Sequence, residues 1–347
     1  MMTCKTIFGG LATLAALACA GTPVLTVPET AQPPVIDGRI DAGEWRDALE
    51  ITGFQLANGL GLAKENTRVF LKYDKNYLYV AAVAADGNTS ILNRGGAYDD
   101  CMEIFVMTPF NRNIYHWLLY SRGTAGFNYV DEEYGGMSRL PPVTAACKAT
   151  VNDGNWMIEA ALPAAGYDLS GIFRSPGWKI SCHRSFNHNQ TAKEDGRGPE
   201  FSGFAPIPGQ FQKPLEFPEL KLGGKGTVPV RMKKFDAAGF ELAAPASAEL
   251  RMTVNGKQTV AVPNRHGVFS ARIPQDARTL ELLITDGAEV IFANRWNFSS
   301  DPASARNALR ARQMATEGLG VSATGSFERV FADLPYCGDN REMALEA

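Results

Sequence analysis

Beyond its first residues this chain lacks long apolar runs, and it lacks the charge pattern of nucleic-acid-binding proteins. Its 347 residues carry 20% charged side chains and a net charge of −3, with no basic run or stripe. Proteins that neutralise phosphates normally show such a basic patch. No segment after the N-terminus is long and apolar enough to span a bilayer. The length instead predicts a folded protein of two domains.

Catalytic signatures are also missing. The chain has four histidines: His116, His183, His188 and His266. None belongs to an H-E-x-x-H motif or another metal-ligand spacing, and no G-x-S-x-G or S-x-x-K motif occurs. The acids at 131–133 and 194–195 are adjacent in sequence, which says nothing about the separation that a glycosidase requires. We therefore expect no enzyme activity, and we expect His183 and His188 to be surface residues.

Cysteine is scarce, with six in the chain. Two of them, Cys4 and Cys19, precede the folded part, and four follow: Cys101, Cys147, Cys182 and Cys337. An even number in an exported protein permits disulfides. Cys147 and Cys182 fall in expected strands, where a cross-link and two buried free thiols are equal alternatives. The pairing stays open.

Residues 1–20 have the features of a secretory signal peptide. Lys5 supplies a basic region, residues 7–18 are apolar or small, and Ala18-Cys19-Ala20 fits a small-x-small cleavage site. We expect a protein that is secreted, periplasmic or held at the cell surface. A lipid anchor at Cys19 is the alternative to simple secretion. The Pro-rich segment 21–34 is predicted to be a linker.

Short alternating strands dominate the rest, together with 34 glycines and 20 prolines. The expected strands are 67–73, 77–85, 100–107, 114–121, 124–130, 143–151, 156–162, 178–186 and 220–222. Closely spaced strands of this kind predict an all-β, antiparallel β-sandwich over 35–222. A glycine-rich hinge at 223–226 would end it.

Alternation within two strands assigns side chains to faces. In segment 100–107, Met102, Ile104 and Val106 share one face, and Glu103 lies on the other. In segment 178–186, Trp178, Ile180 and Cys182 lie on one side, with Ser181, His183 and Ser185 opposite. Glu103 therefore need not enter the core.

A second alternating pattern fills residues 227–299. Segments 250–254 and 259–263 flank Asn255-Gly256, a common hairpin turn. The pattern predicts a smaller, immunoglobulin-like β-sandwich. Asp301-Pro302 then has the form of a capped helix start, so residues 300–347 are expected to hold a short C-terminal helix and a tail.

Five phrases in the first sandwich occur in a characteristic order: VIDGRIDAGEW at 35–45, VFLKYDKNYLYVAAVAAD at 69–86, YDDCMEIFV at 98–106, WMIEAALP at 156–163 and FQKPLEFPELKL at 211–222. Their order and spacing resemble carbohydrate-binding module family 9, in the DOMON-like β-sandwich superfamily. The resemblance implies a secreted module that binds sugars and performs no chemistry.

The resemblance also implies a binding site. Sugar binding needs flat aromatic faces and a few fixed polar groups. Carried over by position, the family's glutamate is Glu103, its two flanking aromatics are Tyr98 and Phe211, and a residue on the next strand is Trp117. The flanking rings are tryptophans in the family, so smaller rings here predict weaker or different sugar binding. The alternatives without ligand binding are that Glu103 is a solvated surface residue, that Tyr98 is a turn residue, and that Phe211 anchors a loop on the sandwich.

The leading hypothesis is an exported, non-catalytic protein that binds a poly- or oligosaccharide, with no nucleic-acid partner and an undetermined oligomeric state. One alternative is a cell-surface scaffold whose sandwich has lost its ligand site. The other is a haem-binding electron-transfer domain. Its axial ligands would come from Met102, Met107, His116 and Met137, although no C-x-x-C-H motif is present.

No cofactor is required by these patterns. Structural calcium is an open alternative, because several acidic residues lie near expected turns: Asp37, Asp41, Asp86, Asp99 and Asp100. None of the spacings matches an EF-hand, so turn residues are the simpler interpretation. Trp45, Tyr79 and Trp156 are expected in the core.

Overall fold

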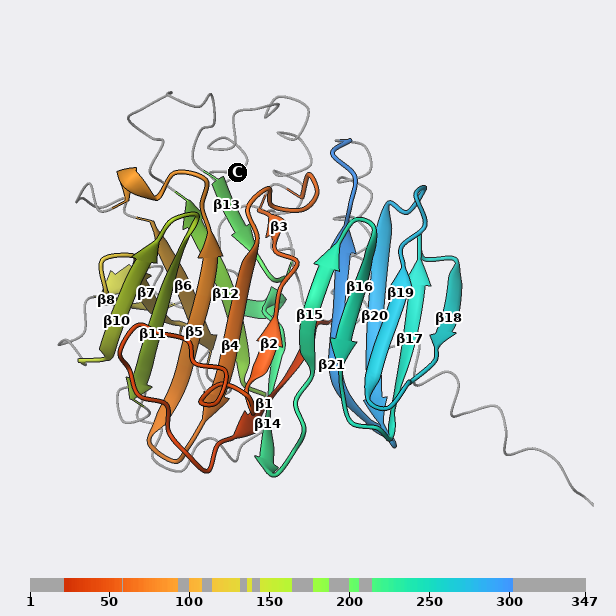
Figure 1. Cartoon of the computed structure of the whole chain (residues 1–347), viewed down its shortest axis with the longest axis horizontal. Helices are drawn as coiled ribbons and strands as arrows, with labels where there is room; N and C mark the ends of the chain where they lie inside the picture. Colours follow the sequence, from red (N-terminus) through yellow and green to blue (C-terminus); the bar gives the residue numbers. More distant parts are fainter. Residues whose placement is uncertain are drawn as a thin grey trace, which may run out of the picture.

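A computed structural model describes residues 22–57, 59–92, 100–107, 114–131, 136–138, 144–163, 177–186, 200–205 and 214–301. The predicted signal peptide and the predicted C-terminal helix from residue 302 onwards lie outside these ranges. The described chain is built from strands and two short 3₁₀ helices (Figure 1). Within it, no helix has the length and apolar character needed to cross a bilayer.

The strands form two groups that lie side by side in Figure 1. The first group comprises β1 (Val24–Glu29), β2 (Leu49–Ile51), β3 (Gln55–Leu56), β4 (Thr67–Tyr73), β5 (Tyr77–Ala85), η1 (Thr89–Ile91), β6 (Cys101–Met107), β7 (Ile114–Tyr120), β8 (Thr124–Asp131), β9 (Gly136–Ser138), β10 (Ala146–Asn152), β11 (Asn155–Pro163), β12 (Lys179–Phe186), β13 (Glu200–Gly203), η5 (Pro214–Glu216) and β14 (Glu219–Lys225). The second comprises β15 (Arg231–Asp236), β16 (Gly239–Ala243), β17 (Ala248–Val254), β18 (Gln258–Val262), β19 (Val268–Arg272), β20 (Thr279–Asp286) and β21 (Glu289–Asn297).

The first group is a sandwich of two sheets. Sheet A has the order β10–β11–β5–β4–β2, with each neighbouring pair antiparallel. Sheet B has the order β9–β8–β7–β6–β12, and β12 continues to β13 and β14. Tight turns join neighbouring strands. Between β4 and β5, for example, Asp74 Oδ1 accepts the backbone N–H groups of Asn76 and Tyr77 at 2.7 and 2.8 Å. The antiparallel sandwich predicted from the alternation is confirmed.

The core lies between the sheets, and the predicted faces are confirmed. Met102, Ile104 and Val106 of β6 are buried in it, opposite the buried residues of sheet A. Trp178, Ile180 and Cys182 belong to the same core. Trp45 and Tyr79 are buried on the outer side of sheet A, and Trp156 lies in the main core. Burial of these large side chains supplies most of the driving force for folding, at about 25 cal/mol per Å² of apolar surface.

Both sheets continue from the first group of strands into the second. Sheet A passes from β2 to β15, β16 and β19, and sheet B passes from β14 through β1 to β21, β20, β17 and β18. One core cluster contains residues of both groups, from Leu25 to Trp296. The second set of strands thus falls within the predicted range 227–299, but it shares its core with the first.

Two boundary predictions need correction. Residues 21–34 were expected to be a linker, yet Val24–Glu29 forms β1, which pairs in parallel with β14 and antiparallel with β21. Residues 223–226 were expected to be a hinge, yet β14 runs through Gly223 and Gly224 to Lys225. Both errors have one cause: long-range pairing overrides a local composition that is typical of loops.

A buried glutamate joins the two groups at the sheet A junction. Glu50 of β2 is 1% exposed and lies opposite Arg231 of β15 in register. Its Oε2 accepts the Arg231 Nε–H at 3.1 Å, and its Oε1 accepts the Arg68 Nε–H at 2.9 Å. Two guanidinium groups therefore compensate one buried carboxylate, which would otherwise carry a large desolvation cost.

A second buried glutamate explains the N-terminal phrase VIDGRIDAGEW. Glu159 of β11 accepts hydrogen bonds from Trp45 Nε1 at 2.7 Å, Gly38 N at 2.9 Å and Asp37 N at 3.1 Å. Gly38 has φ +88°, and a Cβ there would approach Ala149 C to 3.0 Å, so glycine is required. These residues thus hold the N-terminal segment against the outer side of sheet A.

We predict that Glu50→Gln lowers the free energy of unfolding by about 1–3 kcal/mol, because it removes the charge that two guanidinium groups face. Urea denaturation of the full chain measures this. The matched control is Glu249→Gln on an exposed position of β17, which should change stability by less than about 0.5 kcal/mol. Equal effects of the two substitutions would contradict the assigned role of Glu50.

Candidate functional site

Glu103 lies on the outer face of sheet B, as the alternation predicts. Its Cα partners are His183 on β12 and Leu118 on β7. Because Met102 and Ile104 point into the core, the Glu103 side chain points away from it, and it keeps 12% of its surface exposed. The strand therefore holds a carboxylate at a fixed place on a rigid sheet.

Two hydrogen bonds orient that carboxylate. His116 Nε2 on β7 lies 2.7 Å from Glu103 Oε2, and the Ser185 hydroxyl on β12 donates to Oε1. The His116 ring stacks on Phe105, with centroids 4.1 Å apart and an interplanar angle of 13°. Burial by itself raises the pKa of Glu103, but the hydrogen bond and charge of His116, the Ser185 hydroxyl and the charge of His183 lower it, and the net pKa is below its ordinary value. Glu103 is thus an ionised, oriented acceptor.

His183 is buried beside this carboxylate, so the prediction of a surface residue is wrong. It is 1% exposed, its Nε2 lies 2.6 Å from Ser181 Oγ, and its ring packs edge-on against Phe105. A Cβ on Gly203 of β13 would lie 2.4 Å from His183 Nδ1, so the ring packs directly on that glycine. Burial lowers the pKa of His183 to about 3, with Glu103 opposing the shift and His116 adding to it.

One end of this outer face is covered by apolar side chains. Phe105, Met107, Ile114 and Phe217 form a buried cluster there with Ala57 and Ala205. Phe217 follows η5, and its ring centroid lies 5.8 Å from that of Phe105. The covered end explains why His116 and His183 are buried although they point away from the main core.

The other end of the outer face is partly exposed. Leu118 stands opposite Glu103, and Gly126 of β8 stands opposite Leu118. The ring of Tyr120 extends over Gly126, since a Cβ there would lie 3.2 Å from both its Cε2 and its hydroxyl oxygen. Leu118, Tyr120 and Gly126 are half-buried. We refer to Glu103, Leu118, Tyr120 and Gly126 as the Glu103 face.

Tyr120 and His116 also belong to this site, although the sequence patterns did not assign them to sugar binding. The signal was available in the alternation of 114–121, which places His116, Leu118 and Tyr120 on one face. Pairing that face with Glu103 requires the register between β6 and β7, which no local pattern gives. The guanidinium carbon of Arg122 lies 4.8 Å from the Tyr120 ring centroid and adds a cation–π contact.

Of the other site residues expected from the sequence, Trp117 lies on the opposite face. It pairs with Ile104, is 1% exposed, and packs on Phe127 in the core at a centroid distance of 4.5 Å. Its ring is therefore not available for stacking on a sugar, and His116 is the neighbouring residue that reaches Glu103. Tyr98 and Phe211 lie outside the described residues.

A buried arginine lies near several acidic residues at one end of the sandwich. Arg184 of β12 is buried, and Asp86, Asp100, Glu200 and Glu65 raise its pKa against the larger lowering caused by burial. Its guanidinium carbon lies 4.8 Å from the Phe186 ring centroid. Within the described ranges, no group of three or more His, Cys, Asp or Glu side chains could hold a metal ion. Structural calcium stays a prediction, and Asp99 lies outside those ranges.

The structure also describes most of the cysteines and candidate haem ligands that the sequence suggested. Cys147 and Cys182 are free thiols, and burial raises the pKa of both to about 12, while Cys101 is buried. Met102 and Met107 are buried, and the Nε2 atom of His116 is engaged by Glu103. Cys337 lies outside the described residues. Neither a disulfide between Cys147 and Cys182 nor an open axial ligand at His116 Nε2 is present.

Comparison with known proteins gives one partial relative. No protein-family model matches the chain. A segment of 133 residues, 37% of this chain, is 32% identical to part of endo-1,4-beta-xylanase A from Thermotoga maritima. The match covers 12% of the length of that enzyme.

Two solved structures are more distantly similar. Both are of a carbohydrate binding module family 9 from Caldicellulosiruptor kristjanssonii, one in complex with cellotriose and the other with glucose. Their TM-scores are 0.43 and 0.43, with 19% and 18% sequence identity over 58% of this chain and 94% and 97% of theirs.

We predict that His183 makes the protein less stable in acid. Its folded pKa is below its ordinary value of 6.5, so as pH falls the unfolded chain takes up a proton that the folded chain does not. Stability from this residue is therefore complete above pH 6.5 and declines towards pH 3, by about 2 kcal/mol between pH 6.5 and 5.

Urea denaturation at pH 7 and pH 5 tests this prediction. In His183→Asn the difference in unfolding free energy between the two pH values should shrink, whatever the loss of packing does to the absolute stability. His266→Asn is the matched control, since His266 is exposed and its φ of +57° suits asparagine. A His183→Asn protein with the wild-type pH difference would show that another group causes the acid sensitivity.

Proposed function

We propose that this chain is an exported, non-catalytic carbohydrate-binding protein, and that its sugar site is the Glu103 face. The main support for this proposal is that hydrogen bonds hold the ionised carboxylate of Glu103 in a fixed orientation on a sheet that also carries the half-buried ring of Tyr120. Sugar sites combine these two elements: fixed acceptors for hydroxyl groups and an aromatic surface for the C–H face of the ring.

The carboxylate suits a hydrogen-bond acceptor and does not suit the general acid of a glycosidase. A glycosidase acid must hold its proton near neutral pH, which requires a raised pKa. Hydrogen bonds from His116 and Ser185 lower the pKa of Glu103 instead. An ionised carboxylate accepts hydrogen bonds from two neighbouring sugar hydroxyls, and charge-assisted bonds of this kind are stronger than neutral ones.

The tyrosine ring supports a pyranose ring next to that acceptor. Leu118 and Gly126 separate Glu103 from the Tyr120 ring along one row of the sheet, and both are small or apolar. A sugar over this row would contact the Tyr120 ring while its hydroxyls reach Glu103. The ring is smaller than tryptophan, so the affinity should be modest.

The ligand class is supported by the partial relative. The similarity to part of a xylanase is consistent with a protein that acts beside β-1,4-linked polysaccharides. Xylo- and cello-oligosaccharides are accordingly the first ligands to test. Export, which the N-terminal segment 1–20 predicts, would place the protein where such polysaccharides occur.

The test is calorimetric titration of the full chain without its predicted signal peptide, using xylotriose and cellotriose, with added calcium and again with chelator. We expect binding to at least one of them, weakened at least about tenfold by Glu103→Ala, since a lost charge-assisted contact is worth about 1.5–3 kcal/mol. Glu249→Gln is the matched control. Chelator sensitivity would separate calcium-supported folding from direct binding.

Tyr120→Ala and Tyr120→Phe provide a second pair of variants, because Glu103→Ala could also disturb the buried histidines. We expect Tyr120→Ala to weaken binding and Tyr120→Phe to retain most of it, since the ring face remains. No binding of any glycan by folded protein, or binding unchanged in both Glu103→Ala and Tyr120→Ala, would contradict the proposal and favour a scaffold role.

A further inference from the structure

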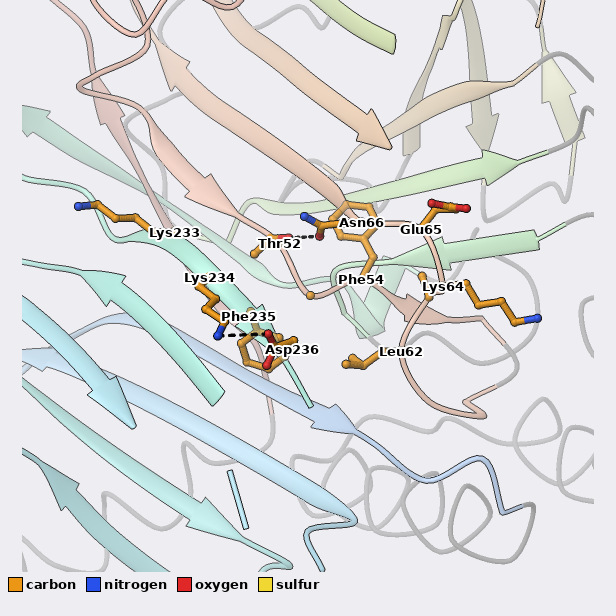
Figure 2. A pocket seen from close by; sticks show the side chains of 12 residues that line it. Thr52, Phe54, Leu62, Lys64, Glu65, Asn66, Lys233, Lys234, Phe235 and Asp236 are labelled. Carbon is orange, nitrogen blue, oxygen red and sulfur yellow. Dashed lines mark hydrogen bonds and ion pairs between the residues drawn. The ribbon is translucent and has the colours of Figure 1, made fainter. Parts of the chain in front are cut away.

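A cleft lies where the two groups of strands meet, away from the Glu103 face. It has a volume of about 340 Å³ and is lined by three segments: residues 52–54 after β2, residues 62–66 before β4, and residues 233–236 of β15. Figure 2 shows Phe54 and Asn66 on one side of it and Phe235 and Asp236 on the other. Small-molecule sites occupy about 300–1,000 Å³ and often lie between such units.

The floor of the cleft is rigid. Gly53 has φ +77°, and a Cβ there would lie 2.5 Å from Phe235 Cδ1, so the Phe235 ring packs directly on the backbone of Gly53. Phe235 also packs on Trp296, with ring centroids 4.3 Å apart. Trp296 Nε1 donates to Gly53 O at 2.8 Å and fixes the arrangement. The floor is therefore formed before any ligand arrives.

The side-chain amide of Asn66 provides a polar group in the lining of the cleft. The buried Thr52 hydroxyl lies 2.7 Å from Asn66 Oδ1 and 2.8 Å from Thr67 O. The oxygen end of the Asn66 amide is thus engaged, as Figure 2 shows. Among the described residues, Asn66 Nδ2 makes no hydrogen bond. Its two N–H groups can donate to an oxygen atom of a ligand.

The charges of the lining favour an anion. It contains three lysines, Lys64, Lys233 and Lys234, against Glu65 and Asp236. The Asp236 carboxylate is 3.5 Å from Lys234 Nζ and also accepts the N–H groups of Ala238 and Gly239, both at 2.9 Å. The negative charge of Glu65 acts on Arg184 and raises the pKa of that guanidinium group.

Two of the lysines stay without a counter-charge. Within the described ranges, Lys64 and Lys233 form no ion pair, and Figure 2 shows them at opposite ends of the cleft. The rim is therefore positive, although the whole chain has a net charge of −3.

We propose that this cleft binds a small acidic sugar, one pyranose ring that carries a carboxylate. The half-buried side chains of Leu62 and Ala63, next to the buried rings of the floor, offer apolar surface to the C–H face of the ring. Asn66 Nδ2 donates to a hydroxyl, and Lys64 or Lys233 pairs with the carboxylate. Two sources share this chemistry, a free uronic acid and the terminal residue of an acidic polysaccharide. The site is independent of the function proposed for the Glu103 face.

Calorimetric titration of the full chain without its predicted signal peptide tests this at low salt, with D-galacturonate, D-glucuronate and trigalacturonate. The neutral probes are glucose and the methyl ester of galacturonate. We expect a uronate to bind at least about fivefold more tightly than its neutral counterpart, and added salt to reduce the difference. Tighter binding of trigalacturonate than of the monomer indicates a polysaccharide end, and weaker binding indicates a free acid.

Substitutions of the lysines that line the cleft test whether the uronate binds there. The double substitution Lys64→Gln and Lys233→Gln should weaken uronate binding at least about fivefold. The matched control is the double substitution Lys75→Gln and Lys257→Gln, which removes two exposed lysines from turns outside the cleft. Glu103→Ala should leave uronate binding intact. Absence of uronate binding, equal binding of the acid and its methyl ester, or an unaffected Lys64/Lys233 variant would overturn the proposal.

Discussion

The two-residue alternation of sheet B is the constraint on which the candidate site depends. Every second residue of β6, β7 and β12 fills the core, so the residues between them must face outward. Glu103, His116 and Ser185 are such residues, and each comes from a different strand. The core that stabilises the fold thereby also fixes the positions of three polar groups, and no flexible loop is needed to bring them together.

Burial then sets the chemistry of these groups. The apolar cluster around Phe105 and Phe217 covers one end of the outer face and removes water from His116 and His183. In that environment His183 stays neutral down to about pH 3, whereas Glu103 keeps its charge because two neighbours hydrogen-bond it. The partly exposed end, at Leu118 and Tyr120, is where a ligand can approach the carboxylate.

The junction between the two groups of strands has its own consequences. Glu50 with its two arginines and the pairing of β1 with β21 hold the groups in a fixed relation. The cleft floored by Phe235 exists because of that fixed relation, since its walls come from both groups. A hinged pair of sandwiches would have no such rigid cavity.

The sequence predicted the parts of this structure that alternation determines, and it failed where long-range pairing decides. The antiparallel sandwich, the face of Glu103 and the burial of Trp45 and Trp156 follow from local patterns. Trp117 was assigned to the site from the family resemblance, but it pairs with Ile104 and faces the core, and in a strand one position changes the face. His183 lies on the predicted face, but its burial depends on Phe217 and Gly203, which are distant in sequence. Segment 24–29 is a strand only because β14 and β21 pair with it.

Sugar binding at the Glu103 face is the central claim, and chemical-shift mapping with cellotriose or xylotriose on isotope-labelled protein tests it most directly. If a sugar binds there, the largest shifts will fall on backbone amides around Glu103, Leu118, Tyr120 and Gly126, while the amides of 233–236 change little. Shifts centred on 52–54 and 233–236 with none at Glu103, or no shifts at all in folded protein at millimolar ligand, would contradict it.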